Sequence, residues 1–112
     1  MAKIDIESLK AQIVARLAPL EPQKVILFGS YAYGTPDENS DIDLYVVTKD
    51  DFVPQNWKEK SEVHLKVANA MQDLLRLYPT DLITHTKPMH EKFIELNTTF
   101  AREIIHKGVA II

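Results

Sequence analysis

The sequence predicts an α/β fold, a two-layer arrangement in which a short mixed β-sheet has helices packed on it. Two apolar runs of strand type, Lys24–Phe28 and Asp41–Val47, lie close together in the chain. A long helical pattern, Trp57–Tyr78, separates the second run from a third at 80–84, and parallel pairing requires such a crossover. The length of 112 residues predicts one domain over residues 1–112.

The first predicted element is an amphipathic helix near the start of the chain. Asp5 has the side chain of an N-cap, and Pro19 with Pro22 ends the helix. Apolar residues recur at steps of three and four, which places them on one stripe: Ile6, Leu9, Ile13, Leu17 and Leu20.

The first strand, Lys24–Phe28, is a buried run that Gly29 ends. We expect Ser30–Tyr33 to form one helical turn before Gly34. The segment from Gly34 to Ser40 has the composition of a loop throughout.

The second strand, Asp41–Val47, has two different faces, because side chains alternate along a strand. One face is apolar, with Ile42, Leu44 and Val46. The other face carries Asp41, Asp43, Tyr45 and Val47. This alternation predicts that two carboxylates point to the same side of the sheet.

The rest of the chain alternates helices and strands. The helix Trp57–Tyr78 is marked by regularly spaced apolar residues, Val63, Val67, Met71, Leu74 and Tyr78, and Pro79 ends it. A third strand is predicted at Thr80–Thr84. Pro88 opens another helix, a last helix runs through Phe100 and Ile105 to Gly108, and Val109–Ile112 is a candidate edge strand.

The composition is that of a globular protein, with 46% hydrophobic and 26% charged residues. The chain has no cysteine, which excludes disulfides, thiolate catalysis and cysteine-based metal sites. The net charge of −3 argues against direct nucleic-acid binding. No apolar run is long enough to span a membrane, and the N-terminus lacks the pattern of a signal peptide, so we expect a cytoplasmic protein.

The residues that can carry chemistry lie at the predicted ends of strands. Gly29 and Ser30 follow the first strand, Asp41 and Asp43 begin the second, and Asp81 begins the third. These residues meet if the first two strands are antiparallel and the third is parallel to the second. One end of the sheet then presents a glycine–serine turn and three carboxylates.

This combination favours metal-dependent phosphate chemistry. Asp41 and Asp43 lie two residues apart on one face of a strand, about 6.6 Å along the backbone, so their carboxylates can converge on cations. Oxygen ligands without His or Cys select Mg²⁺ or Mn²⁺. Gly29 lets the backbone approach a phosphate, and the start of a helical turn at Ser30 faces an anion. Such a site suits in-line nucleotidyl transfer.

The pattern Gly29-Ser30-Tyr31-Ala32-Tyr33-Gly34, followed after six residues by Asp41-Ile42-Asp43-Leu44, resembles the signature of the DNA polymerase β-like nucleotidyltransferase superfamily. Thr80-Asp81-Leu82-Ile83 resembles the strand that bears the third carboxylate of that family. The short length and the C-terminal segment 102–108 are most similar to its minimal nucleotidyltransferase (MNT) branch.

The resemblance implies a nucleotidyltransferase fold and the transfer of NMP, with AMP from ATP expected, to an acceptor hydroxyl. Asp41, Asp43 and Asp81 would hold two Mg²⁺ ions, with Mn²⁺ as a substitute, and Asp81 would assist deprotonation of the acceptor. Gly29 and Ser30 would bind the triphosphate. The implied partner is a HEPN-domain toxin for which this chain is the antitoxin, in a homo- or hetero-oligomer.

Two alternatives follow from the same residues. Many relatives carry an arginine where this chain has Tyr33, so a phosphate-facing cation is missing, and the chain is also compatible with an antitoxin that neutralises its partner by binding alone. Transfer to a small molecule, as in aminoglycoside-type enzymes, fits less well because no pocket-forming segment remains. Asp81 alone also fits a strand-edge or N-cap carboxylate, and Tyr31 and Tyr33 fit either base stacking or packing under the turn.

Overall fold

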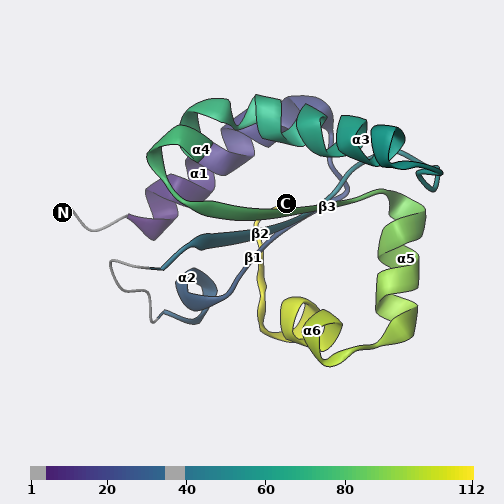
Figure 1. Ribbon diagram of the computed structural model, residues 1–112. Helices are drawn as coiled ribbons and strands as arrows, with labels where there is room; N and C mark the ends of the chain where they lie inside the picture. The colour runs from purple at the N-terminus through teal and green to yellow at the C-terminus, as the bar shows by residue number, and fades with distance from the viewer. Residues whose placement is uncertain (1–4, 35–39) are drawn as a thin grey trace.

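The computed structural model describes residues 5–34 and 40–112, which form a four-stranded mixed sheet with helices on both faces (Figure 1). The predictions for residues 1–4 and for most of the loop before the second strand, 35–39, lie outside the described residues. The strands are β1 (Lys24–Phe28), β2 (Ile42–Val47), β3 (Thr80–His85) and β4 (Val109–Ala110). The helices are α1 (Ile6–Leu17), α2 (Ser30–Tyr33), α3 (Trp57–Ala70), α4 (Gln72–Leu77), α5 (Lys87–Leu96) and α6 (Thr99–Arg102). A 3-10 turn, η1 (Ala18–Leu20), follows α1, and a π-helical turn, η2 (Glu103–Lys107), follows α6.

The strand order is β3-β2-β1-β4, which places β2 and β1 in the middle of the sheet. The strand β1 is antiparallel to β2 and to β4, whereas β2 and β3 are parallel. The predicted pairing is therefore confirmed, and α3 with α4 forms the crossover between β2 and β3. No helix in the described part of the chain is both long and apolar enough to cross a membrane.

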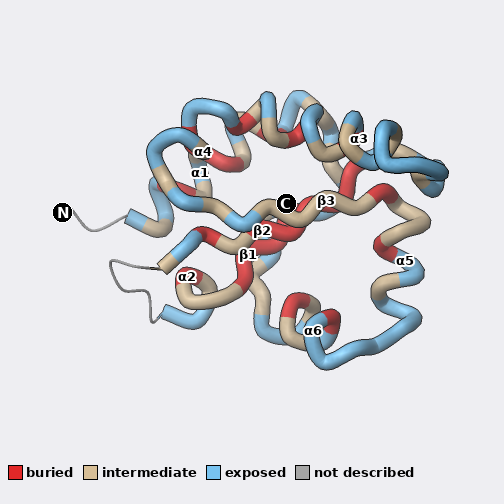
Figure 2. Tube along the Cα trace, in the orientation of Figure 1, coloured by how far each residue is buried: buried red, intermediate tan, exposed pale blue. Residues whose placement is uncertain are grey.

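The core has one part on each face of the sheet. In Figure 1, α1, α3 and α4 cover one face, and α6 with α5 lies on the other. The first part is built on the apolar face predicted for β2, with Ile42, Leu44 and Val46. The second part contains Ile26, Phe28, Tyr45, Val47 and Ile104. Burial is concentrated in β1 and β2, whereas every residue of β3 keeps some exposure (Figure 2).

Local chemistry explains where most elements begin and end. The Asp5 carboxylate accepts hydrogen bonds from the N–H groups of Glu7 and Ser8, so the predicted N-cap of α1 is confirmed. Pro19 lies in η1, where the α-helix has already given way to a tighter turn. The N-cap of α3 is Asn56, whose side chain accepts from the N–H of Glu59.

The single helix predicted for Trp57–Tyr78 is wrong in one respect, because Met71 interrupts it between α3 and α4. Met71 has φ −105° and ψ 13°, and its N–H is shared between the carbonyls of Val67 and Ala68. Its side chain is buried, and both Met71 and Leu74 belong to the core part that also contains residues of α1. No Gly or Pro marks the interruption in the sequence.

Candidate functional site: an acidic strand end beside a glycine–serine turn

The sheet brings the predicted site residues together at one end of β2. In the strand register, Asp43 lies opposite Phe28 of β1 and opposite Asp81 of β3. Neighbouring strands are about 4.8 Å apart, so Asp43 and Asp81 are lateral neighbours on the same face. Asp41 precedes β2, and Gly29 directly follows Phe28. The antiparallel and parallel pairings thus gather residues that are distant in the sequence.

The three carboxylates differ in exposure and influence one another. Asp41 and Asp81 are exposed, whereas Asp43 is half-buried in the central strand. Burial raises the pKa of the Asp43 carboxyl above its ordinary value, and the negative charges of Asp81 and Asp41 raise it further. The raised pKa means that the ionised form of Asp43 is less favourable in this fold than in a freely solvated aspartate.

Gly29 allows the Asp43 carboxylate to lie directly against the backbone. Its φ of 73° and ψ of −159° fall in a region of backbone conformation that residues other than glycine hardly adopt. A Cβ atom at position 29 would overlap the carboxylate of Asp43. The absence of a side chain at position 29 is therefore what lets the acidic strand and the turn pack directly against each other.

The turn α2 begins at Ser30, immediately after Gly29. The carbonyl of Gly29 accepts hydrogen bonds from Ala32 and Tyr33 at 3.0 and 3.1 Å. The first N–H groups of a helical turn have no partner within the helix and point outward from its N-terminal end. Of the two tyrosines, Tyr31 is buried in the core, which confirms packing under the turn for that residue.

Tyr33 is held by a residue from the far end of the chain. Its hydroxyl donates a hydrogen bond of 3.0 Å to the carboxylate of Glu103 in η2, and the residue as a whole remains 40% exposed. Burial and the bond to Glu103 raise the pKa of Tyr33. Position 33, where the family resemblance implies an arginine, thus holds a neutral residue hydrogen-bonded to a carboxylate.

A hydrogen-bonded cluster that the sequence did not predict supports β2 next to the site. The hydroxyl of Tyr45 lies 2.9 Å from Nδ1 of His85 and 2.8 Å from Nδ1 of His90. Burial lowers the pKa of His85 to about 4 and also lowers the pKa of His90. Both imidazoles are therefore neutral at pH 7, and the Tyr45 hydroxyl donates to one and accepts from the other.

Tyr45 follows Asp43 by two residues and shares its face of β2. Phe93 stacks on the Tyr45 ring at a centroid distance of 5.1 Å. The only signal in the sequence was a polar aromatic residue on the acidic face, because the histidine partners come from β3 and α5. This cluster fixes the strand that carries Asp43.

As the side chains stand, no group of three or more Asp, Glu, His or Cys residues within the described ranges is close enough to hold a metal ion. Asp41 and Asp81 are exposed, so a change of rotamer requires no repacking of the core. The donor set consists of carboxylate oxygens, the type of ligand that Mg²⁺ and Mn²⁺ prefer. The residues therefore fit a divalent cation in their chemistry, and the mutual repulsion at Asp43 is the property that a cation would relieve.

Comparison with known proteins identifies a family. The model of the nucleotidyltransferase domain family matches residues 8–109. No curated protein sequence matches the chain significantly.

Three solved structures share the fold. A toxin–antitoxin complex with AMP-PNP is 24% identical and has a TM-score of 0.56. The match covers 92% of this chain and 72% of the chain in that structure. A complex of tri-AMPylated HEPN toxin with MNT antitoxin from Shewanella oneidensis is 19% identical, covers 96% and 72%, and has a TM-score of 0.51. A structure described as a minimal nucleotidyltransferase is 19% identical, covers 97% and 98%, and has a TM-score of 0.56. With the family model spanning nearly all of α1 to β4, the chain belongs to the nucleotidyltransferase domain family.

Proposed function

We propose that the protein transfers AMP from ATP to an acceptor hydroxyl on a protein. The register pair of Asp43 and Asp81 beside the Gly29 turn is the observation that carries this proposal. The acceptor oxygen forms a bond to the α-phosphorus of ATP, and the bond from that phosphorus to the bridging oxygen of the β-phosphate breaks. Pyrophosphate leaves, and the proton of the acceptor hydroxyl passes to the carboxylate of Asp81.

Each residue has a distinct part in this proposal. Asp41, Asp43 and Asp81 would hold two Mg²⁺ ions, or Mn²⁺ in their place. When bound, the metal ions neutralise charge on the phosphates and stabilise the attacking and leaving oxygens. Gly29 and Ser30 would bind the triphosphate: Gly29 brings the turn against the Asp43 carboxylate, and the start of α2 at Ser30 provides N–H groups and a hydroxyl.

The acceptor that we propose is a HEPN-domain protein, with this chain as its antitoxin. The support is the shared fold with an MNT antitoxin bound to a tri-AMPylated HEPN toxin and with a toxin–antitoxin complex containing AMP-PNP. The resulting complex would be a hetero-oligomer. A cytoplasmic location belongs to the same proposal, because ATP is the donor.

The test is the transfer of label from α-³²P-ATP to a co-expressed HEPN-domain partner in the presence of Mg²⁺ or Mn²⁺. We expect label on the partner with the wild-type chain. Asp43→Asn should lower the rate by more than about a hundredfold, since even the residues that orient metal ligands contribute 10–100-fold. Absence of label under conditions in which the two proteins form a complex would contradict the proposal.

A second candidate function is neutralisation by binding alone, and Tyr33 is the observation that favours it. Its hydroxyl is bound to Glu103, so this position offers a phosphate no positive charge. The double variant Asp41→Asn/Asp43→Asn separates the two functions. Growth protection by the double variant would support binding alone, whereas loss of protection with an intact complex would support catalysis.

A further inference from the structure

The strand β3 has one edge open to solvent. Backbone bonds from Ile42 N–H to the Pro79 carbonyl (2.9 Å) and from Thr48 N–H to the His85 carbonyl (2.8 Å) bracket its pairing with β2. In this parallel pattern the backbone N–H and C=O groups of Leu82 and Thr84 point away from β2. No backbone hydrogen bond from another described residue reaches Leu82 or Thr84 outside the sheet. An open edge of this kind can accept an additional strand.

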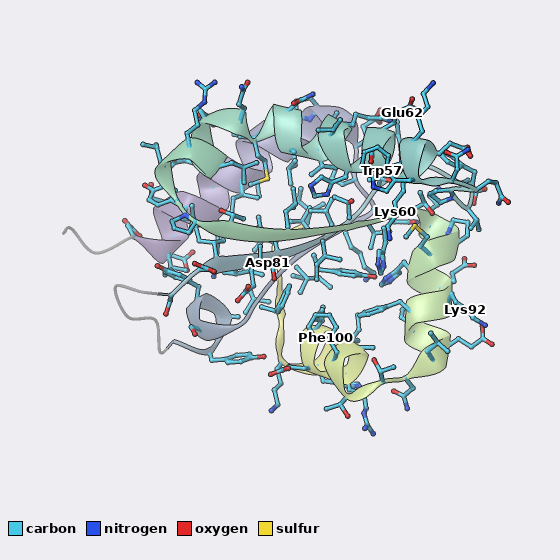
Figure 3. The ribbon with its side chains drawn as sticks, in the orientation of Figure 1. Trp57, Lys60, Glu62, Asp81, Lys92 and Phe100 are labelled. Atoms are coloured by element: carbon cyan, nitrogen blue, oxygen red, sulfur yellow. The ribbon has the colours of Figure 1, made fainter. Side chains whose placement is uncertain are left out.

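A groove runs along this open edge. Its wall on α3 is formed by Trp57, Lys60, His64 and Leu65, and its floor by residues 82–85 of β3. The groove has a volume of about 560 Å³. Trp57 is 81% exposed, and Leu65 is 52% exposed. Figure 3 shows Trp57 and Lys60 over one part of β3 and Asp81 farther along the same strand. We call this feature the β3-edge groove.

The ionisable residues of the β3-edge groove are Lys60, His64 and His85. Within the described part of the chain, no carboxylate lines the groove, although the protein as a whole has a net charge of −3. The charge of Lys60 contributes to the low pKa of His85, which leaves that imidazole neutral at pH 7. Lys60 is therefore the side chain through which the groove favours an acidic ligand.

We propose that the β3-edge groove binds an extended acidic segment of the acceptor protein, which adds as a strand to the free edge of β3. The inference rests on the proposed function, because it supplies the route by which a protein hydroxyl reaches the site. Asp81 directly precedes Leu82 in β3, so a strand on this edge runs along the groove to the proposed base. Residues 82–85 span about 13 Å, enough for about four residues of an extended segment.

The charge of the groove argues against a second copy of the chain as its occupant. A second copy would bring the same lining, with its Lys60 charge and no carboxylate among the described residues, so it would offer this groove no opposite charge. The exposed indole of Trp57 and the side chain of Leu65 provide apolar contacts for alternate side chains of an extended peptide.

Trp57 provides a direct optical probe of binding, because the sequence contains one tryptophan. The probes are two synthetic peptides that differ in charge, Glu-Val-Tyr-Val-Glu-Val and Lys-Val-Tyr-Val-Lys-Val. We expect the acidic peptide to shift the Trp57 emission to the blue and to bind about tenfold more tightly than the basic peptide. This titration needs neither nucleotide nor metal.

Two variants test the mechanism of binding, with Lys58→Glu as the matched control. Lys60→Glu should raise the dissociation constant of the acidic peptide about tenfold. Lys58→Glu, an equal charge change outside the groove, should leave that constant within about twofold of the wild-type value. Thr84→Pro removes an outward N–H, which an edge strand tolerates, and should weaken binding by a similar factor. Circular dichroism verifies the fold, and if Thr84→Pro is unfolded, Lys60→Glu with its control decides the question.

Several outcomes would overturn the proposal. Equal binding of both peptides, or unchanged binding by Lys60→Glu, would remove the charge argument. A shift of the Trp57 emission to the blue without peptide, as the protein concentration is raised, would point to self-association. Such a shift, together with a dimer in size-exclusion chromatography, would assign the β3 edge to a second copy of the chain. Label transfer to the partner at an unchanged rate in Lys60→Glu and Thr84→Pro would overturn the proposed role of the groove in binding the acceptor, while the proposed function would stand. Peptide binding without any label transfer would uphold the groove and contradict the proposed function.

Discussion

At the scale of single residues, Asp43 is where the fold and the proposed chemistry conflict. It lies in the central strand, it is half-buried, and it has two acidic neighbours. Its pKa in the folded state is raised above the unfolded value, so the unfolded chain loses its proton at lower pH. Folding is therefore opposed by this group once the pH rises above the range in which it ionises.

The first prediction concerns Asp43→Asn in the absence of metal. The free energy of unfolding should stay the same or rise by up to about 1 kcal/mol, the size of the repulsion between two charges about 4 Å apart in water. Thermal melting with a chelator measures this effect, and Asp51→Asn, at an exposed position, serves as the control. Mg²⁺ with ATP should then raise the melting temperature of the wild type and of Asp51→Asn only. A large loss of stability in metal-free Asp43→Asn would instead assign Asp43 a structural role.

The second prediction compares two glycines of the turn. Gly29→Ala should cost about 1–3 kcal/mol, because the backbone conformation there excludes side chains and the new Cβ overlaps the Asp43 carboxylate. Gly34→Ala should cost only about 1–2 kcal/mol. The φ of 78° at residue 34 is strained for alanine, but apart from its chain neighbours no atom of the described residues lies within 4 Å of the added Cβ. Urea denaturation measures both values. Nucleotide binding should be lost in Gly29→Ala and retained in Gly34→Ala, and equal binding by both variants would contradict the assigned role of Gly29.

At the scale of elements, β2 is fixed by side chains on both of its faces. The apolar face is buried against α1 and α3, and the acidic face continues into the Tyr45, His85 and His90 cluster. His85 has a folded pKa of about 4 against an ordinary value of 6.5. In the window between these values the unfolded chain binds more protons than the folded one, so stability falls as the pH falls through it.

The third prediction is a loss of stability below pH 6.5 that depends on His85. The free energy of unfolding should decrease from pH 6.5 towards pH 4, with a contribution of at most about 1.4 kcal/mol per pH unit for one histidine. His85→Gln should flatten this dependence, and His106→Gln should preserve it. Because protonation of Asp43, whose pKa is raised in the fold, changes stability with the opposite sign, the difference between variant and wild type is the quantity to compare. Identical slopes in His85→Gln and wild type would contradict the prediction.

The strands were predictable because each is a short apolar run between breakers. The bounds of β1 and α2, and the start of β3, agree with the sequence patterns. The interruption at Met71 was not predictable, because no helix-breaking residue marks it in the sequence. The Tyr45 cluster and the bond between Tyr33 and Glu103 were also missed, since their partners are distant in the chain and are defined only by the tertiary fold.

At the scale of the whole molecule, the sheet places two kinds of surface along β3. One end of the strand carries Asp81 beside Asp43, and the open edge beyond it forms the β3-edge groove. At the opposite side of the sheet, the edge strand is the short β4, which pairs with Ile26 and Leu27 of β1. Under the proposed function, the acidic end would bind the nucleotide with its metal ions, and the adjacent edge would bind the acceptor protein.

The most direct test of the central claim is a crystal structure of the protein with Mg²⁺ and a non-hydrolysable ATP analogue. We predict Mg²⁺ bound by carboxylate oxygens of Asp41, Asp43 and Asp81, and a triphosphate in contact with Gly29 and Ser30. Asp41→Asn/Asp43→Asn under the same conditions should bind no Mg²⁺ at this position. A triphosphate bound elsewhere, or metal ions held without Asp43 and Asp81, would contradict the account.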